Sequence, residues 1–420
     1  MGVEFKPSPK FLERVKLLDD TLHCRRTDHV LTAPFVMALP LNMYGGCNMH
    51  DAMMDYANCE EDYLKYHDEF QPDLAWGPQA IFPGCALEML GCQYVKIPGV
   101  DIPDPNAGFQ IVDKEEGFME PEEYLEYAED PTGFVMRKVL PRQFSALKGL
   151  EMVDFSNSIW QGALYSMIPC ALPPVHAAFE ALEAAGAKMM MTAESSGKLM
   201  MALAAHGFPS ACDTAFLVPF DVFNDSLRGF MNTTMDMIEY PDELLAAVNA
   251  STKVQIRHIK NTFARQPFAK NVCFFVHNGF DMFMSVEQWQ TFYWPGAKAC
   301  IEAVIECGGT PHLYFEDKMD SKLEIIARDI PVGKCILTFI NSDIELVKKH
   351  LTGKACLSGG VDGVLLQHGT KEEVIQNVKD AIDRWAPGGG YFLNCDVSLE
   401  NAKPENLHAL FDTAMSYMKY

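Results

Sequence analysis

The stretch from residue 298 to residue 316, KACIEAVIECGGTPHLYFE, decides the fold. Its first ten residues place apolar side chains on one helical face, and Gly308-Gly309 is typical of a helix end. The apolar run PHLYF that follows predicts a buried strand, and Glu316 stands at the carboxyl end of that strand. This stretch therefore predicts the helix and strand of one βα repeat.

Similar strands, each with a polar end, recur on both sides of this stretch. The run VCFFV (272–276) ends at His277, CILTFI (335–340) ends at Asn341, and YFLNC (391–395) ends at Asp396. Capping signals such as Thr370 with Glu373 open helices between the strands. The alternation predicts an α/β fold, a (β/α)8 TIM barrel, although a doubly wound open sheet shows the same local pattern.

We expect one barrel domain spanning residues 1–420, because no repeat and no Gly/Ser linker divides the chain. Residues 1–70 predict an N-terminal helical elaboration that packs on the barrel or on a second subunit. Residues 97–143, rich in proline, glycine and acidic residues, predict an inserted excursion on the barrel face.

Composition excludes several classes of protein. The chain has 420 residues, of which 48% are hydrophobic, so it can bury a full core. Its 34 basic and 57 acidic residues give a net charge of −23, which disfavours nucleic acid and anionic lipid as partners. No apolar run is long enough to span a membrane, and the N-terminus resembles no signal peptide, so we expect a cytoplasmic protein. Its 13 cysteines contain no C-x-x-C pair, which indicates reduced thiols.

Polar residues at the predicted strand ends are the candidates for chemistry. In a barrel the carboxyl ends of all strands meet at one mouth, so residues far apart in sequence converge there. Imidazole, carboxylate and thiolate together form a zinc ligand set. Each residue also has a structural reading: His277 could hydrogen-bond a turn, Cys395 could fill the core and Asp343 could cap a helix. The set comprises His277, Asn278, Asp281, Tyr314, Glu316, Asp317, Asn341, Asp343, Asp362, Asn394, Cys395 and Asp396.

Several longer motifs resemble the uroporphyrinogen decarboxylase superfamily in their order and spacing. They are MSVEQWQTFYWPGAKACIEAVIECGGTPHLYFED (284–317), LTGKACLSGGV (351–361), LLQHGTKEEVIQNVKDAIDRWAPGGGYFLNCDV (365–397) and KPENLHAL (403–410). The resemblance is clear over residues 270–420 and implies a TIM barrel.

Two branches of the superfamily differ in the chemistry that they imply. The porphyrinogen decarboxylases carry an arginine-rich N-terminal segment that grips substrate carboxylates, whereas this chain has LPLNMYGGCNMHD (39–51) there, without arginine. The corrinoid-dependent methyltransferases that act on coenzyme M hold zinc with an H-x-C pair, and this pattern would fall on Tyr314 and Glu316. A carboxylate in place of the thiolate disfavours a thiol substrate and suits an oxygen ligand.

The resemblance therefore implies a corrinoid-dependent methyltransferase that resembles the methyltransferase components of aromatic O-demethylases. It would transfer a methyl group from an aromatic methyl ether to the Co(I) of a separate corrinoid protein, since the chain has no D-x-H-x-x-G cobalamin motif. Zinc would be held by His277, Glu316 and Cys395. Catalytic groups would be Tyr314, Asp343 and Asp281, and substrate-binding groups Asn278, Asn341 and Asp396.

Three alternatives remain open at the level of sequence. The first is a metal-free lyase resembling uroporphyrinogen decarboxylase, and the second is a methylcobalamin:thiol methyltransferase. The third is a corrinoid- or tetrapyrrole-binding module without catalysis. The resemblance also implies a possible homodimer.

Overall fold

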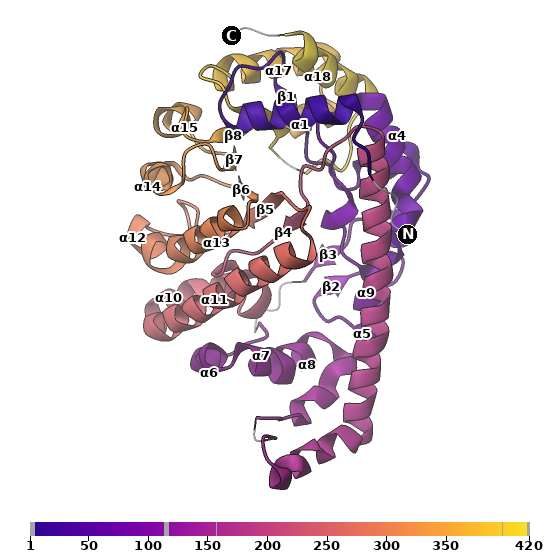
Figure 1. The fold of residues 1–420 in the computed structure, drawn as a ribbon, viewed down its shortest axis with the longest axis vertical. Helices are drawn as coiled ribbons and strands as arrows, with labels where there is room; N and C mark the ends of the chain where they lie inside the picture. The colour runs from indigo at the N-terminus through magenta and orange to yellow at the C-terminus, as the bar shows by residue number, and fades with distance from the viewer. Residues whose placement is uncertain (1–4, 113–116, 157, 397, 418–420) are drawn as a thin grey trace.

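The central element is a parallel β-sheet that curves into a barrel (Figure 1). The computed structural model describes residues 5–112, 117–156, 158–396 and 398–417. Seven strands follow one another in the order β1-β9-β8-β7-β6-β5-β4, and every neighbouring pair is parallel. The strands are β1 (Leu31–Thr32), β4 (Thr214–Ala215), β5 (Asn271–Val276), β6 (Thr310–Phe315), β7 (Ile336–Phe339), β8 (Cys356–Val361) and β9 (Tyr391–Cys395).

Residues 73–75 close the barrel between its two outermost strands. The backbone N–H of Asp73 donates to the carbonyl of Thr32 on β1 (2.7 Å). On the other side, Ala75 donates to Pro209 (2.7 Å) and accepts from Ala211 (2.8 Å), just before β4. This short segment occupies the eighth strand position, so the predicted (β/α)8 barrel is confirmed and the open sheet is not formed.

Helices separate the strands of the C-terminal half, as predicted. Ser285 with Gln288 and Thr370 with Glu373 each form a capping box, so these helices begin where the sequence indicates. Pro404 starts the last helix. The helices between and after these strands are α11 (Pro241–Arg265), α12 (Val286–Gln288), α13 (Trp294–Glu306), α14 (Leu323–Asp329), α15 (Ile344–Leu351), α16 (Gly363–His368), α17 (Lys371–Trp385) and α18 (Pro404–Ser416).

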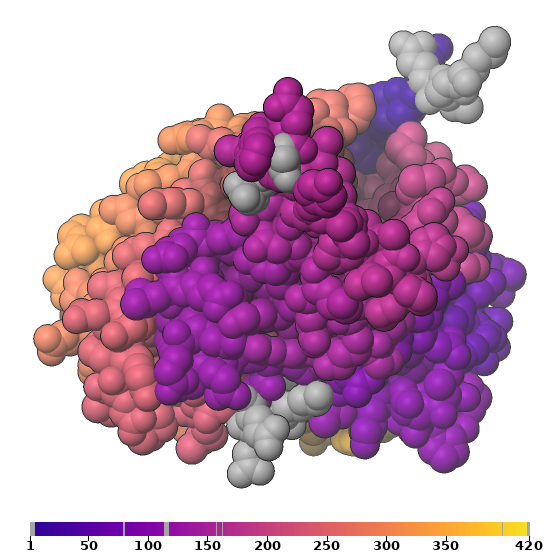
Figure 2. Space-filling view, turned by 90° about the horizontal axis from the view of Figure 1, so that it is seen from below, coloured from indigo at the N-terminus to yellow at the C-terminus, as the bar shows by residue number. Residues whose placement is uncertain are grey.

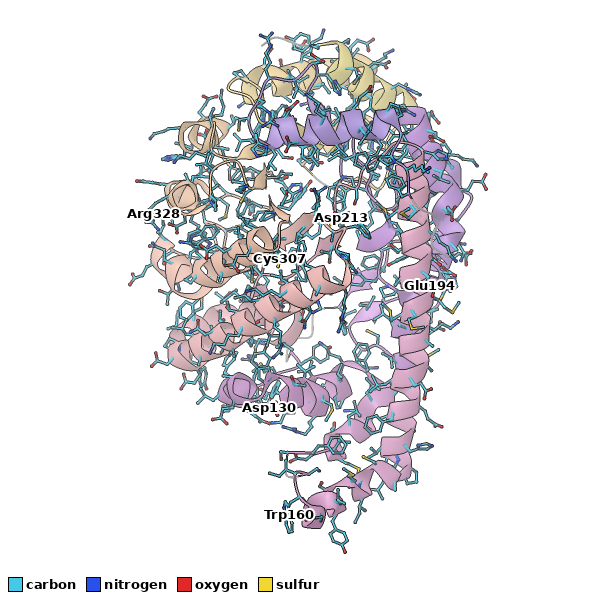
Figure 3. The ribbon with its side chains drawn as sticks, viewed as in Figure 1. Asp130, Trp160, Glu194, Asp213, Cys307 and Arg328 are labelled. Carbon is cyan, nitrogen blue, oxygen red and sulfur yellow. The ribbon has the colours of Figure 1, made fainter. Side chains whose placement is uncertain are left out.

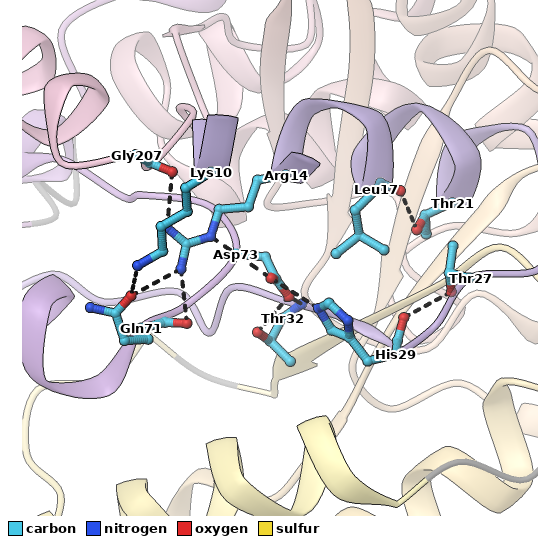
Figure 4. A network of polar contacts seen from close by, with 10 residues as sticks. All are labelled: Lys10, Arg14, Leu17, Thr21, Thr27, His29, Thr32, Gln71, Asp73 and Gly207. Atoms are coloured by element: carbon cyan, nitrogen blue, oxygen red, sulfur yellow. Dashed lines mark hydrogen bonds and ion pairs between the residues drawn. The ribbon is translucent and has the colours of Figure 1, made fainter. Parts of the chain in front are cut away.

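The N-terminal region contains helices and also one barrel strand, β1. Helix α1 (Pro9–Leu22) lies across the amino-terminal side of the barrel and is held there by the buried Arg14 (Figure 4). The guanidinium of Arg14 donates to the carbonyl of Gly207 (2.9 Å) and lies 4.0 Å from the carboxylate of Asp73. Four short helices follow: α2 (Leu39–Tyr44), α3 (Met49–Met54), α4 (Glu60–Phe70) and α5 (Gly84–Leu90).

The excursion predicted over residues 97–143 packs against the region that follows β4. The buried Arg228 donates to the carbonyl of Met119 (2.8 Å) and to the carboxylate of Asp236 (2.8 Å), which also accepts from Tyr124 (2.7 Å). This network joins the excursion to α10 (Phe230–Glu239). The region also contains β3 (Gln110–Ile111), which pairs with β2 (Val95–Lys96) just before it, and the helices α6 (Tyr124–Glu129), α7 (Pro131–Phe134) and α8 (Leu140–Gln143).

Beyond the excursion the chain forms a protruding tip and returns through α9 (Pro173–Ala205). Trp160 marks the tip in Figure 3, and Figure 2 shows the magenta tip in front of the barrel. No described helix combines the length and the hydropathy that crossing a membrane requires.

Candidate active site

Two residues predicted from the sequence, His277 and Glu316, meet at the carboxyl end of the barrel. They follow β5 and β6, whose last residues Val276 and Phe315 are paired in the sheet. The Nε2 atom of His277 lies 3.8 Å from Oε1 of Glu316. Both side chains are partly exposed, at 38% and 43%, so a reactant can approach them.

Asp225 fixes the orientation of the His277 ring. Its Oδ2 atom lies 2.6 Å from Nδ1 of His277, which leaves Nε2 directed toward Glu316. Asn278 donates to the other oxygen of Asp225 (2.9 Å), so the carboxylate is held on both sides. The next residue, Gly279, has φ of +81°, and a Cβ there would lie 3.1 Å from the rings of Trp289 and Tyr293, so the turn after Asn278 favours glycine.

Asp221 also binds Asn278, the residue that holds Asp225 in place. Its carboxyl group is fully buried and accepts hydrogen bonds from Tyr293 (2.7 Å) and from the side chain of Asn278 (3.2 Å). Burial, together with the nearby charge of Asp225, raises the pKa of Asp221 to about 7. Asp221 is linked to the His277 imidazole through Asn278 and Asp225.

The surroundings keep His277 protonated. Burial lowers the pKa of this imidazole, but its hydrogen bond to the Asp225 carboxylate and the charges of Asp225 and Glu316 outweigh burial and raise it to about 9. Burial also raises the pKa of Glu316, and the charge of His277 opposes that change. At neutral pH the imidazolium consequently presents an N–H at the barrel mouth.

An aromatic floor lies beneath the histidine. We give this name to Phe35, Trp76, Phe275 and Tyr314. The Phe35 ring centroid is 4.5 Å from that of Trp76, 5.6 Å from that of Phe275 and 6.0 Å from that of Tyr314. The His277 ring is stacked on Phe275 at 6.5 Å. Phe35 and Phe275 are only partly buried, so these two rings, tilted by 30° to each other, offer an apolar surface next to the imidazolium, whereas Trp76 and Tyr314 are buried.

The structure does not bring Cys395 to this pair. Along β9, Phe392 faces the barrel interior and contacts His312, whereas Tyr391 stacks on Trp385 of the outer helix α17. Strand side chains alternate, so Cys395 faces outward like Tyr391, and it is fully buried. Burial raises the pKa of its thiol well above the ordinary value. The three zinc ligands predicted from the sequence are therefore not assembled, because the third points to the opposite face of its strand.

Replacing Cys395 by alanine should leave any methyl-transfer rate and any bound metal unchanged within about twofold, because the thiol does not reach the mouth. The expected cost is about 1 kcal/mol of unfolding free energy from a small core cavity. Metal analysis and steady-state kinetics of C395A beside the wild type check this. A large loss of metal or rate in a folded variant would restore Cys395 to the site.

The predicted catalytic residues Tyr314, Asp281 and Asp343 are engaged elsewhere. The buried hydroxyl of Tyr314 donates to the backbone carbonyl of Cys395 (2.9 Å). The Asp281 carboxylate accepts from Ser321 (2.6 Å) and from Lys322 (3.0 Å). Burial raises the pKa of Asp281, but these hydrogen bonds outweigh it and the pKa is lowered. Asp343 caps α15, which is the structural alternative that the sequence allowed for this residue. None of the three presents a free proton at the mouth.

Of the predicted substrate-binding residues, only Asn278 contacts the central cluster. Asn341 donates to Asp317 (3.2 Å), and Asp396 accepts from the backbone of Gly363 (2.9 Å). Asp396 and Asp343 line a separate cavity of about 440 Å³, which includes neither His277 nor Glu316.

Within the described part of the chain, no group of three or more His, Cys, Asp and Glu side chains is arranged to hold a metal ion. The donor atoms available at the mouth are Nε2 of His277 and the Glu316 carboxylate. A catalytic zinc ion generally takes three protein ligands, so the residues present do not fit the predicted site.

Sequence reasoning missed Asp221 and Asp225, the two acids that set the state of the histidine. Their signal was present, since the apolar run TAFLVPF (214–220) ends at Asp221 like the other strand ends. Only Thr214 and Ala215 of that run form β4, and the preceding half of the chain lacks the regular alternation that made later strands legible.

The chain is thus a (β/α)8 barrel with a histidine-carboxylate cluster at the carboxyl ends of its strands. Residues 215–417 match the family model described as uroporphyrinogen decarboxylase (URO-D). This match covers 203 of the 420 residues and confirms the resemblance to the uroporphyrinogen decarboxylase superfamily that the sequence indicated.

A solved structure described as a methyltransferase from Methanosarcina mazei is similar in fold. Its TM-score is 0.59 at 13% sequence identity, and the alignment covers 96% of this chain and 98% of that chain. No protein with a curated description matches the sequence.

Proposed function

We propose that the barrel mouth catalyses methyl transfer from an aromatic methyl ether to the Co(I) of a separate corrinoid protein. The observation that carries the proposal is His277, held protonated between Asp225 and Glu316 beside the aromatic floor. The match to the URO-D family model and the methyltransferase description of a structure with the same fold support methyl transfer. The corrinoid partner follows from the resemblance to corrinoid-dependent methyltransferases.

The reaction needs help at the leaving oxygen. Co(I) supplies an electron pair to the methyl carbon, the carbon–oxygen bond breaks, and its electron pair stays on oxygen. Nε2 of His277 gives its proton to that oxygen, and the product leaves as a neutral phenol. A phenol has a pKa of about 10, close to the value of about 9 for His277, so donor and acceptor are matched.

The other residues support this proton transfer. Asp225 holds the ring in place and stabilises the imidazolium, while Glu316 lies within reach of the same nitrogen. The aromatic floor would stack against the ring of the methoxyarene. Asn278 donates to both Asp221 and Asp225 and so holds the carboxylate that orients the histidine.

The zinc ion stays a prediction, and it competes with the protonated histidine for the same nitrogen. If an ion binds at His277 and Glu316, substrate or water would have to complete its coordination. No step above depends on it. Two of the three alternatives lose support at this mouth: a carboxylate-gripping lyase needs cations where Asp221, Asp225 and Glu316 lie, and a thiol methyltransferase needs the thiolate that Cys395 does not supply.

A panel of methyl donors tests the proposal. The purified protein would be mixed with reduced corrinoid and equal concentrations of a methoxyarene, an aliphatic methyl ether or methanol, and loss of Co(I) followed by absorbance. We expect transfer from the methoxyarene at least tenfold faster than from the others, because only the phenol leaves near the histidine pKa. Equal rates for all donors, or no transfer from any methoxyarene, would contradict it.

A further inference from the structure

A second cavity, of about 990 Å³, lies at the opposite end of the barrel from the histidine. It is bounded by α1, by the last turns of α9 and by the amino-terminal ends of the strands, where Asn271 and Thr310 begin β5 and β6. In Figure 3, Asp213 marks its wall, and Cys307 precedes the wall residue Gly308. Its volume lies at the upper end of the range of about 300–1,000 Å³ typical of small-molecule sites.

The walls of this cavity are mainly apolar and open to solvent. Phe11, Val15 and Leu18 of α1, at helical spacing, line the cavity together with Met201 of α9. Phe268 on the rim is 91% exposed. Helix α1 is not loosely attached, because Arg14 ties it to Gly207 and Asp73 (Figure 4). An accessible apolar surface on a well-anchored scaffold suits an apolar ligand.

The polar groups of the cavity favour an anion. Its two carboxylates are engaged: Asp19 pairs with Arg25, and Asp213 accepts the backbone N–H groups of Lys270 (2.7 Å) and Asn271 (2.9 Å). The ammonium groups of Lys270 and Lys334 have no ion-pair or hydrogen-bond partner among the described residues. Both lysines line the cavity, in a chain whose net charge is −23.

A third polar group points to a ligand as well. The hydroxyl oxygen of Ser210 is buried, lines this cavity and has no hydrogen-bond partner within the described ranges. Buried polar atoms normally find a partner, so this hydroxyl adds an unsatisfied polar group to the cavity wall.

We propose that this cavity binds one carboxylate-headed amphiphile, a medium- or long-chain fatty acid. Its chain lies against Phe11, Val15, Leu18 and Met201, and its carboxylate faces Lys270 and Lys334 at the rim. This site is separate from the proposed methyl-transfer site, so either proposal can fail without the other.

Titration calorimetry with three probes of equal chain length tests the site: dodecanoate, dodecanol and dodecyltrimethylammonium, each below its micellar concentration. We expect one dodecanoate per chain, bound about tenfold more tightly than dodecanol and more tightly still than the cationic probe. The double variant Lys270→Ala/Lys334→Ala should bind dodecanoate only as well as dodecanol. Lys371→Ala, which removes an exposed lysine outside the cavity, should change nothing.

A second variant separates cavity binding from adhesion to the lysines. Ala204→Trp should fill part of the cavity and abolish binding of both dodecanoate and dodecanol, with an unchanged circular dichroism spectrum. No dodecanoate binding by the wild type would overturn the proposal. So would equal affinity for the cationic probe, or undiminished binding by both the double lysine variant and Ala204→Trp.

Discussion

Replacing His277 by glutamine is expected to lower kcat for transfer from a methoxyarene by about a thousandfold. A positioned general acid contributes roughly 10²–10⁴ in rate, and His277, with its pKa of about 9, is protonated near pH 7 with Nε2 directed toward Glu316 at the mouth. Glutamine keeps a hydrogen-bond donor of similar size but has no proton to give. The measurement is single-turnover loss of Co(I) under anaerobic conditions.

The leaving group distinguishes a chemical role from a structural one. Electron-withdrawing substituents lower the pKa of the phenol, so the departing oxygen needs less help, and the deficit of H277Q should shrink steadily across such a series. His176→Gln, which alters an exposed histidine on α9, should match the wild type throughout. A deficit that is the same for every leaving group would show that His277 only holds the site together.

Asp225→Asn is expected to move the pH dependence of the same reaction by about two units. The rate requires protonated His277, so in the wild type it should be constant below pH 9 and fall as the pH rises through about 9. Asparagine keeps the hydrogen-bonding shape but removes the charge that opposes burial. The histidine pKa should then fall to its ordinary value of about 6.5 or lower.

At pH 8 the variant should therefore be more than tenfold slower, and it should recover most of its rate near pH 6. The full profile of kcat for D225N against the wild type checks this, with Asp281→Asn as a control carboxylate engaged by Ser321 and Lys322. An unshifted profile would mean that another group sets the protonation state.

The raised pKa of His277 also links this site to stability. A group whose pKa is higher in the folded state stabilises the fold fully below its unfolded pKa, and this contribution is lost as the pH rises through about 9. Activity and this contribution to the free energy of unfolding are therefore both lost as the pH rises through about 9.

Sequence patterns were informative where periodicity was strong. Apolar runs that end in a polar residue located β5, β6, β7 and β9, and thereby placed His277 and Glu316 next to each other. The first half was harder, because β1 and β4 have two residues each and the segment at 73–75 closes the barrel through only a few hydrogen bonds. Runs this short carry no measurable period.

The direction in which strand side chains point was the second feature that the sequence did not predict. Cys395 and Asn394 are neighbours at the end of one strand, and only alternation counted from a known inward residue, here Phe392, shows that the thiol faces outward. Tyr314 does face inward, but the sequence did not reveal that its hydroxyl donates a hydrogen bond to the backbone carbonyl of Cys395. Contacts between strands that are distant in sequence decide both outcomes.

The fate of a labelled methyl group tests the central claim most directly. The wild-type protein would be incubated with a methoxyarene carrying ¹³C in its methoxy group and with reduced corrinoid protein, and both products quantified. The account predicts ¹³C-methyl on cobalt and free phenol in equal amounts, with neither formed by H277Q above background. Phenol without methylated cobalt, or equal product from H277Q, would contradict it.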